Sequence, residues 1–163
     1  MIPPPKLRSL EEEKERHATW LELFYDLVFV AVISQIGVMF HHHFNWQGFG
    51  EFVFLFIPIW WAWVGHTMYS NRFDTNDMYH RVITFFQMGA AAFLAASVQE
   101  ALGYKSRTFA AAYVLIRLSL LMSYIRVYRH LPLTRTFIGR IGPGFAIGTG
   151  CWIASFFVES PLR

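Results

Sequence analysis

The run LVFVAVISQIGVMFHHHFNWQGFG, residues 27–50, contains no Asp, Glu, Lys or Arg. Residues 52–71, 82–99 and 141–158 form similar uncharged runs, and residues 108–125 are interrupted by a single charge, Arg117. About 20 apolar residues are needed for a helix to cross a hydrocarbon layer of about 30 Å. These runs are apolar on every face, whereas helices of a soluble bundle keep a polar face. The sequence therefore predicts an all-α, polytopic transmembrane bundle of about five spans, near residues 20–41, 49–70, 80–102, 107–127 and 141–159.

The composition of the 163-residue chain supports the same class. Hydrophobic residues make up 55% and charged residues 15%, whereas a soluble domain carries about 25% charged residues. The one cysteine, Cys151, cannot form an intrachain disulfide. These features exclude a disordered chain, a disulfide scaffold and most soluble enzymes. We expect a cytoplasmic N-terminal segment at 1–19, a transmembrane helical domain at 20–159 and a short C-terminal end at 160–163.

Lys and Arg are distributed unevenly between the two ends of the predicted spans. Ten lie in the N-terminal segment and in the second and fourth connections, and three, Lys105, Arg107 and Arg163, lie on the other side. Basic residues favour the cytoplasmic side of short loops. The sequence thus predicts a cytoplasmic N-terminus, an outer C-terminus and a location in the cell inner (plasma) membrane. Since this asymmetry accounts for the net charge of +3, we predict no nucleic-acid partner.

Several polar side chains fall inside the predicted spans, where an unpaired charge is costly. They are Glu22, Asp26, His66, Gln87 and Arg117. The helical rise places the last four in one layer of the cytoplasmic half, so an Asp26–Arg117 ion pair is expected, directly or through Gln87. Such a pair has two interpretations. It fixes helix register only, or it belongs to a proton or ion relay or anchors a charged substrate.

A charged connection follows the second predicted span. It contains Asn71, Arg72, Asp74, Asp77 and Arg81, which are expected to form a charged cytoplasmic turn. Asn71 suits a helix C-terminus and Asp77 suits the N-cap of the next helix. We favour these capping roles over divalent-metal binding, because the spacing of a calcium loop is absent. Arg81 and Arg126 are both candidate partners for the shallower Glu22.

Three adjacent histidines, His41, His42 and His43, end the first predicted span. Adjacent helical residues point in different directions, so these histidines fit an interfacial turn better than a metal site. No Ser-His-Asp spacing, HExxH motif or cysteine pair occurs in the sequence. We therefore predict no metal, no cofactor and no catalytic residue.

Aromatic residues make up 18% of the chain, and the 17 Phe residues exceed what interfacial belts of Trp and Tyr require. Gly144 and Gly148 form a GxxxG pattern in the last predicted span, which is typical of close helix packing inside a bundle or against a partner. Besides the lipid bilayer, we therefore expect other membrane subunits or further copies of the chain as partners, and bound lipids or pigments.

The segment Trp20-Leu-Glu22-Leu-Phe-Tyr-Asp26-Leu-Val-Phe29-Val resembles the opening motif of the bacterial low-temperature-requirement A family. The similarity continues through Trp61-Ala-Trp63, Tyr69-x-Asn71-Arg72-Phe73-Asp74, Asp77, Arg81 and Phe109-Ala-x-x-Tyr113-Val-x-x-Arg117, and it covers residues 17 to 130. The resemblance implies a polytopic membrane protein, linked by name to growth in the cold, without a defined biochemical activity. It also implies about twice as many spans, as family members usually have. The chain is thus expected to be a half-length relative, a fragment, or a subunit that assembles with another chain.

Two functions follow from these patterns. We expect an accessory or structural subunit of a larger membrane assembly, and not an enzyme. The alternative is a component of an ion, proton or small-solute transporter or channel that uses the intramembrane Asp–Arg cluster.

Overall fold

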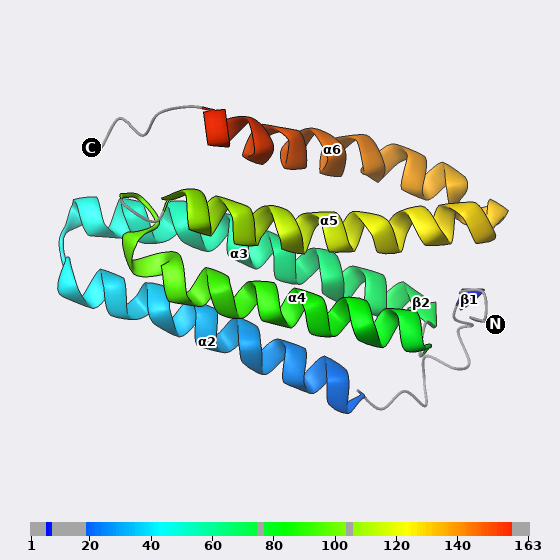
Figure 1. Ribbon diagram of the computed structural model, residues 1–163, viewed down its shortest axis with the longest axis horizontal. Coiled ribbons are helices and arrows are strands. Elements are labelled where there is room, and N and C mark those ends of the chain that lie inside the picture. The colour runs from blue at the N-terminus through cyan, green and yellow to red at the C-terminus, as the bar shows by residue number, and fades with distance from the viewer. Residues whose placement is uncertain (1–5, 8–18, 75–76, 104–105, 158–163) are drawn as a thin grey trace.

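The computed structural model describes residues 6–7, 19–74, 77–103 and 106–157. Most of the predicted N-terminal segment, and all of residues 160–163, lie outside this part. Helices dominate the described residues (Figure 1). The long helices are α2 (Trp20–His42), α3 (Trp46–Arg72), α4 (Met78–Ser97), α5 (Ser106–His130) and α6 (Arg135–Ala154). The short 3-10 segments are η1 (Val98–Glu100), η2 (Pro132–Thr134) and η3 (Ser155–Phe157).

Four helices, α2, α3, α4 continued by η1, and α5, are long and apolar enough to cross a membrane. The predicted bounds of the fifth helix need correction. Helix α6 begins at Arg135 instead of residue 141, ends at Ala154, and is not among the four that qualify by length and composition. The uncharged-run criterion failed at this boundary because a helix tolerates charged residues in its first turns. Arg135 remains exposed there, and its Nε donates a hydrogen bond to the Tyr128 carbonyl at 3.3 Å.

The helices form a bundle in which α2 and α5 are not neighbours. Helix α2 packs against α3 and α4, whereas α5 packs against α4, α3 and α6 (Figure 1). The core contains Tyr25, Leu55, Leu94 and Ile116, one from each candidate spanning helix. Ala91, which has no exposed surface, gives α4 a small buried face. Helix α6 lies at the edge of the bundle against α5 (Figure 1).

The turn between α2 and α3 is tight. His43 caps the end of α2, and the Asn45 side chain accepts a hydrogen bond from the Gly48 N–H at 2.7 Å, which begins α3. A Cβ atom at position 48 would lie 1.9 Å from the His43 carbonyl oxygen. This approach is therefore open only to glycine.

A short strand pair lies at the opposite end of the bundle. Strands β1 (Lys6–Leu7) and β2 (Phe73–Asp74) pair antiparallel, with Lys6 opposite Asp74. The pairing places part of the N-terminal segment against the connection between α3 and α4 (Figure 1). We call this end of the molecule, where α2 and α4 begin and α3 and α5 end, the basic end. It carries Arg72, Arg81, Arg126 and Arg129.

Candidate functional site

A polar pocket lies between the first turns of α2 and the last turns of α3, at the basic end. Its volume is about 280 Å³. It is lined by Glu22, Tyr25, Asp26, His66, Thr67, Ser70 and Asn71. Glu22 and Asp26 reach it together because residues four apart share one face of a helix. The pocket thus gathers three of the predicted intramembrane residues with Asn71 of the predicted charged turn.

Glu22 also starts helix α2. The Thr19 hydroxyl accepts a hydrogen bond from the Glu22 N–H at 3.3 Å, and the Glu22 carboxylate accepts one from the Thr19 N–H at 3.3 Å. This capping box satisfies backbone donors that a helix start leaves unpaired. The spacing Thr19-x-x-Glu22 is its sequence signal. Glu22 therefore has a structural role as well as a place in the pocket.

Two side-chain contacts join α2 to α3 at the pocket. Trp63 donates a hydrogen bond from its indole Nε1 to the Asp26 carboxylate at 2.8 Å. Tyr25, which is fully buried, stacks on the His66 ring with 3.8 Å between centroids. No short-range pattern indicated either contact, since the partners lie about 40 residues apart along the chain.

Some buried polar atoms around His66 lack a hydrogen-bond partner among the described residues. His66 is buried, and its Nε2 lies 3.3 Å from the Ser70 hydroxyl. Gln87 of α4 lies beside His66. The Gln87 Oε1 and the Tyr25 hydroxyl have no hydrogen-bond partner within the described part of the chain. A buried polar atom left unsatisfied costs about 1–3 kcal/mol, so a water molecule or a ligand atom would bind most favourably here.

The predicted Asp26–Arg117 pair is wrong. Arg117 is only 4% exposed, and its guanidinium donates to the Phe145 carbonyl at 3.1 Å and lies 4.4 Å from the centroid of the Phe145 ring. Asp26 instead accepts from Trp63, and Gln87 does not bridge the two charges. The Nε and NH1 atoms of Arg117 have no hydrogen-bond partner among the described residues. Similar depth in the membrane did not bring the charges together, because α4 lies between α2 and α5.

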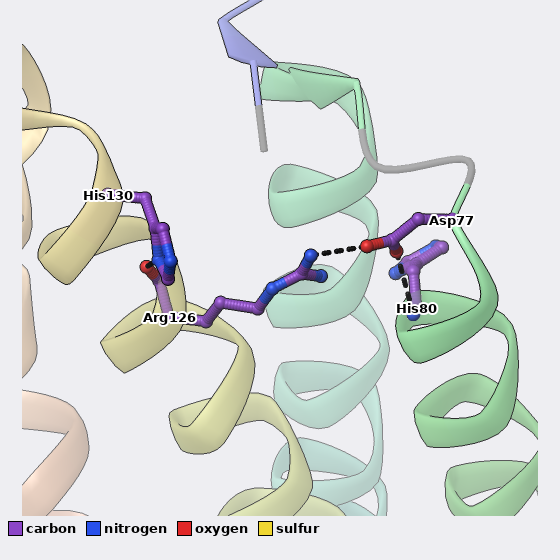
Figure 2. A network of polar contacts seen from close by, with 4 residues as sticks. All are labelled: Asp77, His80, Arg126 and His130. Carbon is purple, nitrogen blue, oxygen red and sulfur yellow. Dashed lines mark hydrogen bonds and ion pairs between the residues drawn. The ribbon is translucent and has the colours of Figure 1, made fainter. Parts of the chain in front are cut away.

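The predicted N-cap at Asp77 is confirmed. Its Oδ1 accepts a hydrogen bond from the His80 N–H at 2.9 Å, which begins α4. Its Oδ2 forms an ion pair with Arg126 of α5 (Figure 2). Arg126 was a candidate partner of Glu22, and among the described residues it forms its ion pair with Asp77. The pair fastens the start of α4 to the end of α5.

The environment of Asp77 favours its charged form. Burial alone would raise the pKa of this carboxyl group. The hydrogen bonds from Arg126 and from the His80 backbone, together with the positive charges nearby, outweigh burial and hold the pKa below its ordinary value of 3.8. Asp77 is therefore ionised at neutral pH.

Three other residues of the predicted charged turn are placed by the structure on different elements. Arg72 lies over the Phe137 ring of α6, with 3.8 Å from its guanidinium carbon to the ring centroid. Asp74 belongs to β2, and Arg81 lies on the exposed surface of α4. Among the described residues, Asp77 forms its ion pair with Arg126 of α5, outside this turn.

Gly144 and Gly148 of α6 lie in different environments. A Cβ atom at Gly148 would lie 3.1 Å from Arg117 NH2, so Gly148 makes room for the guanidinium. Gly144 has open space beside it. The close approach at Gly148 is therefore to a side chain, and α6 brings no other helix within reach at Gly144 in the described part of the chain.

The histidine run ends α2 as expected for a turn. His41, His42 and His43 are largely exposed, and the His41 and His42 rings are nearly perpendicular, with centroids 6.0 Å apart. Among the described residues, no three His, Cys, Asp or Glu side chains are grouped closely enough to hold a metal ion.

Four apolar helices of spanning length indicate a multi-pass membrane protein. The family model described as bacterial low temperature requirement A protein (LtrA) matches residues 17–163, and the chain belongs to this family. The match extends beyond the predicted range of 17 to 130 and includes α6. An uncharacterized protein of Rhizobium meliloti (strain 1021) is 27% identical over 154 residues. The alignment covers 94% of this chain and 38% of that protein, so the chain spans less than half the length of this relative. No solved structure matches the chain.

Proposed function

We propose that this chain is a non-enzymatic structural or accessory subunit of a larger membrane assembly, and that α3 carries the surface that binds a partner helix. Trp60 and Trp61 lie near the middle of this 27-residue helix and are 42% and 49% exposed. At 1.5 Å per residue, they lie about 17–18 Å from the end of α3 at Arg72. Tryptophan normally occupies the membrane–water interface and not the hydrocarbon centre.

The exposed indole groups carry the proposal. Among the described residues, the N–H groups of Trp60 and Trp61 have no hydrogen-bond acceptor, whereas that of Trp63 on the same helix donates to Asp26. A buried donor without a partner is costly in hydrocarbon, and lipid tails offer no acceptor. A neighbouring membrane helix supplies carbonyl or side-chain oxygens. A protein partner therefore suits this surface better than lipid does.

The proposed topology has five spans, a cytoplasmic N-terminus and an outer C-terminus in the cell inner (plasma) membrane. Arg117 lies near the middle of α5, and its guanidinium is covered by Phe145 and Gly148 of α6. Helix α6 must reach the same depth to cover it, which supports a fifth span. The excess of basic residues at the basic end supports the cytoplasmic location of that end.

Two measurements test the subunit proposal. We expect the protein in mild detergent to exceed the 19.0 kDa monomer mass after the detergent contribution is subtracted. The double variant Trp60→Phe/Trp61→Phe should shift toward the monomer, because it keeps the apolar rings and removes both donors. The control Trp20→Phe changes an exposed tryptophan at the first turn of α2, where an interfacial belt is expected, and should leave the mass unchanged.

A photo-reactive amino acid at position 61 should give a discrete protein adduct in the native membrane. A monodisperse monomer in detergent, combined with adducts to lipid alone, would contradict the proposal.

A second function, a pathway for protons or small cations, is favoured by the pocket that places Glu22 and Asp26 beside His66. Arg117 takes no part in it, since it lies against α6. In proteoliposomes, this function requires a cation flux that Glu22→Gln/Asp26→Asn abolishes. The matched control Glu51→Gln, at the other end of α3, should retain the flux. Absence of flux in the wild-type protein would leave the subunit role as the proposal.

A further inference from the structure

A larger pocket lies at the basic end between the first turn of α4 and the last turns of α5. Its volume is about 450 Å³. It is lined by Tyr79, Met122, Ile125, Arg126, Arg129 and His130. Along α5, Met122 lies about 6 Å further toward the membrane centre than Arg126, and Ile125 lies about 6 Å further than Arg129. The pocket is therefore basic near the surface and apolar below it.

The charges that line this pocket are only partly neutralised. Arg126 pairs with Asp77 (Figure 2). Its guanidinium carbon lies 4.5 Å from the Tyr79 ring centroid. Arg129 is exposed and has no ion-pair or hydrogen-bond partner in the described part of the chain. The His130 Nδ1 donates to the Arg126 carbonyl at 2.8 Å, which holds the ring at the wall of the pocket. The pocket thus keeps an excess of positive charge.

The helix ends around the pocket do not cancel this excess. The C-terminus of α5 carries a partial negative charge, and the N-terminus of α4 carries a partial positive charge of similar size. Both ends meet at the Asp77–Arg126 contact, so their fields roughly offset each other. The Arg129 guanidinium remains as the uncompensated full charge.

We propose that this pocket binds the phosphate-bearing headgroup of an anionic phospholipid in the leaflet at the basic end. Arg129 supplies charge-assisted donors to the phosphate oxygens, and His130 adds a polar wall beside it. Met122 and Ile125 contact the first methylene groups of an acyl chain. The basic and apolar parts of the pocket thus follow each other along the membrane normal as the headgroup and acyl chains of a phospholipid do. A free phosphate ion would use only the basic half of the pocket. This site is separate from the partner surface of α3, and the inference holds for either function considered above.

Native mass spectrometry of the delipidated 163-residue chain in detergent tests the site. The probes are dioctanoyl phosphatidylglycerol, dioctanoyl phosphatidylcholine and inorganic phosphate. A basic residue near the surface contributes about 1 kcal/mol to the attraction of anionic lipid, which corresponds to a factor of about five in affinity. We expect Arg129→Gln to weaken phosphatidylglycerol binding about fivefold and Arg129→Gln/His130→Gln to weaken it further.

The matched controls carry the same charge change elsewhere. Arg140→Gln alters an exposed arginine in the second turn of α6, and Arg107→Gln alters one at the other end of α5; neither residue lines the pocket. Both should bind phosphatidylglycerol as the wild type does. Arg129→Lys keeps the charge and should retain most of the binding, so it tests the site even if the glutamine variants fold poorly. The site is overturned if Arg140→Gln weakens binding as much as Arg129→Gln, or if phosphatidylcholine binds equally well. It is also overturned if inorganic phosphate displaces the lipid, because the pocket would then hold a soluble anion.

Discussion

Replacing Asp77 by Asn tests whether one ion pair holds α4 and α5 together at the basic end. The side chains of Arg126 and Asp77 are 11% and 6% exposed, so both are largely shielded from water. Asparagine keeps an oxygen that can accept the His80 N–H bond and removes only the charge. The substitution therefore separates the ion pair from the helix cap.

The expected losses follow from burial. Removing one partner of a buried ion pair costs about 3–5 kcal/mol, since the other charge is left uncompensated. Because this pair lies at the end of the bundle, we expect the lower limit, about 3 kcal/mol, for Asp77→Asn and for Arg126→Gln. Asp77→Ala also removes the cap and should cost about 1 kcal/mol more. The double variant Asp77→Asn/Arg126→Gln leaves no stranded charge and should cost no more than either single variant.

The assay is the free energy of unfolding in mixed micelles, followed by far-ultraviolet circular dichroism as the denaturing detergent fraction rises. The double-mutant cycle should give a coupling energy of about 3 kcal/mol between Asp77 and Arg126. Additive losses, each within the range of about 0–1 kcal/mol found for exposed pairs, would refute the reasoning. The pair would then be screened by water despite its geometry.

The pH dependence of stability tests the same pair independently. The pKa of Asp77 lies below its ordinary value of 3.8 in the folded chain, so the folded state releases this proton more readily than the unfolded state. The stabilisation is complete above the unfolded pKa of about 3.9 and is lost as the pH falls through the lower folded pKa. Asp77→Asn should remove this component, so the stability difference between wild type and variant should shrink below about pH 4. A difference that stays constant from pH 7 to pH 3 would contradict the lowered pKa.

Two further predictions concern glycines, and both use the same unfolding assay. Gly48→Ala should lower the free energy of unfolding by about 2 kcal/mol, because its Cβ meets a backbone carbonyl of the preceding turn. Gly50→Ala, with open space around it, should raise that free energy by up to about 1 kcal/mol, and equal effects at the two positions would contradict the close approach. Gly148→Ala should be about 1 kcal/mol less stable than Gly144→Ala, because only the former displaces the Arg117 guanidinium from its carbonyl acceptor. Equal stability of these two variants would show that Arg117 moves aside without cost.

The membrane class and the four candidate spans could be predicted from the sequence because insertion depends on composition and length, which a single sequence contains. The cap at Asp77 could be predicted for a similar reason, since an N-cap contacts backbone only three residues away. The start of α6 at Arg135 could not. An uncharged run shows which residues suit the hydrocarbon layer, but it does not show where the helix begins. Helix α6 begins before its uncharged run, with exposed arginines in its first turns.

The pairing of charges could not be predicted, because helical rise gives depth but not which helices are neighbours. Asp26 and Arg117 were matched by depth, yet α4 lies between their helices. Arg117 donates to the main-chain carbonyl of Phe145. Because every residue has a main-chain carbonyl, no side-chain pattern in the sequence identifies this acceptor. Asp26 accepts a hydrogen bond from Trp63, which lies 37 residues away along the chain. To choose that donor among the tryptophans of α3, one must know which face of α3 is turned toward α2, and the sequence alone does not give this orientation.

The two proposed surfaces of this chain can be tested separately because they differ in depth and in helix. Trp60 and Trp61 lie near the middle of α3, whereas Arg129 and His130 lie in the last turn of α5 at the basic end. If the surfaces act independently, Trp60→Phe/Trp61→Phe should reduce assembly and leave phosphatidylglycerol binding intact, and Arg129→Gln/His130→Gln should do the reverse. Free energies of distant sites without shared partners add. A variant that reduced both would therefore mean that the lipid lies between this chain and its partner, and that assembly and lipid binding are one event.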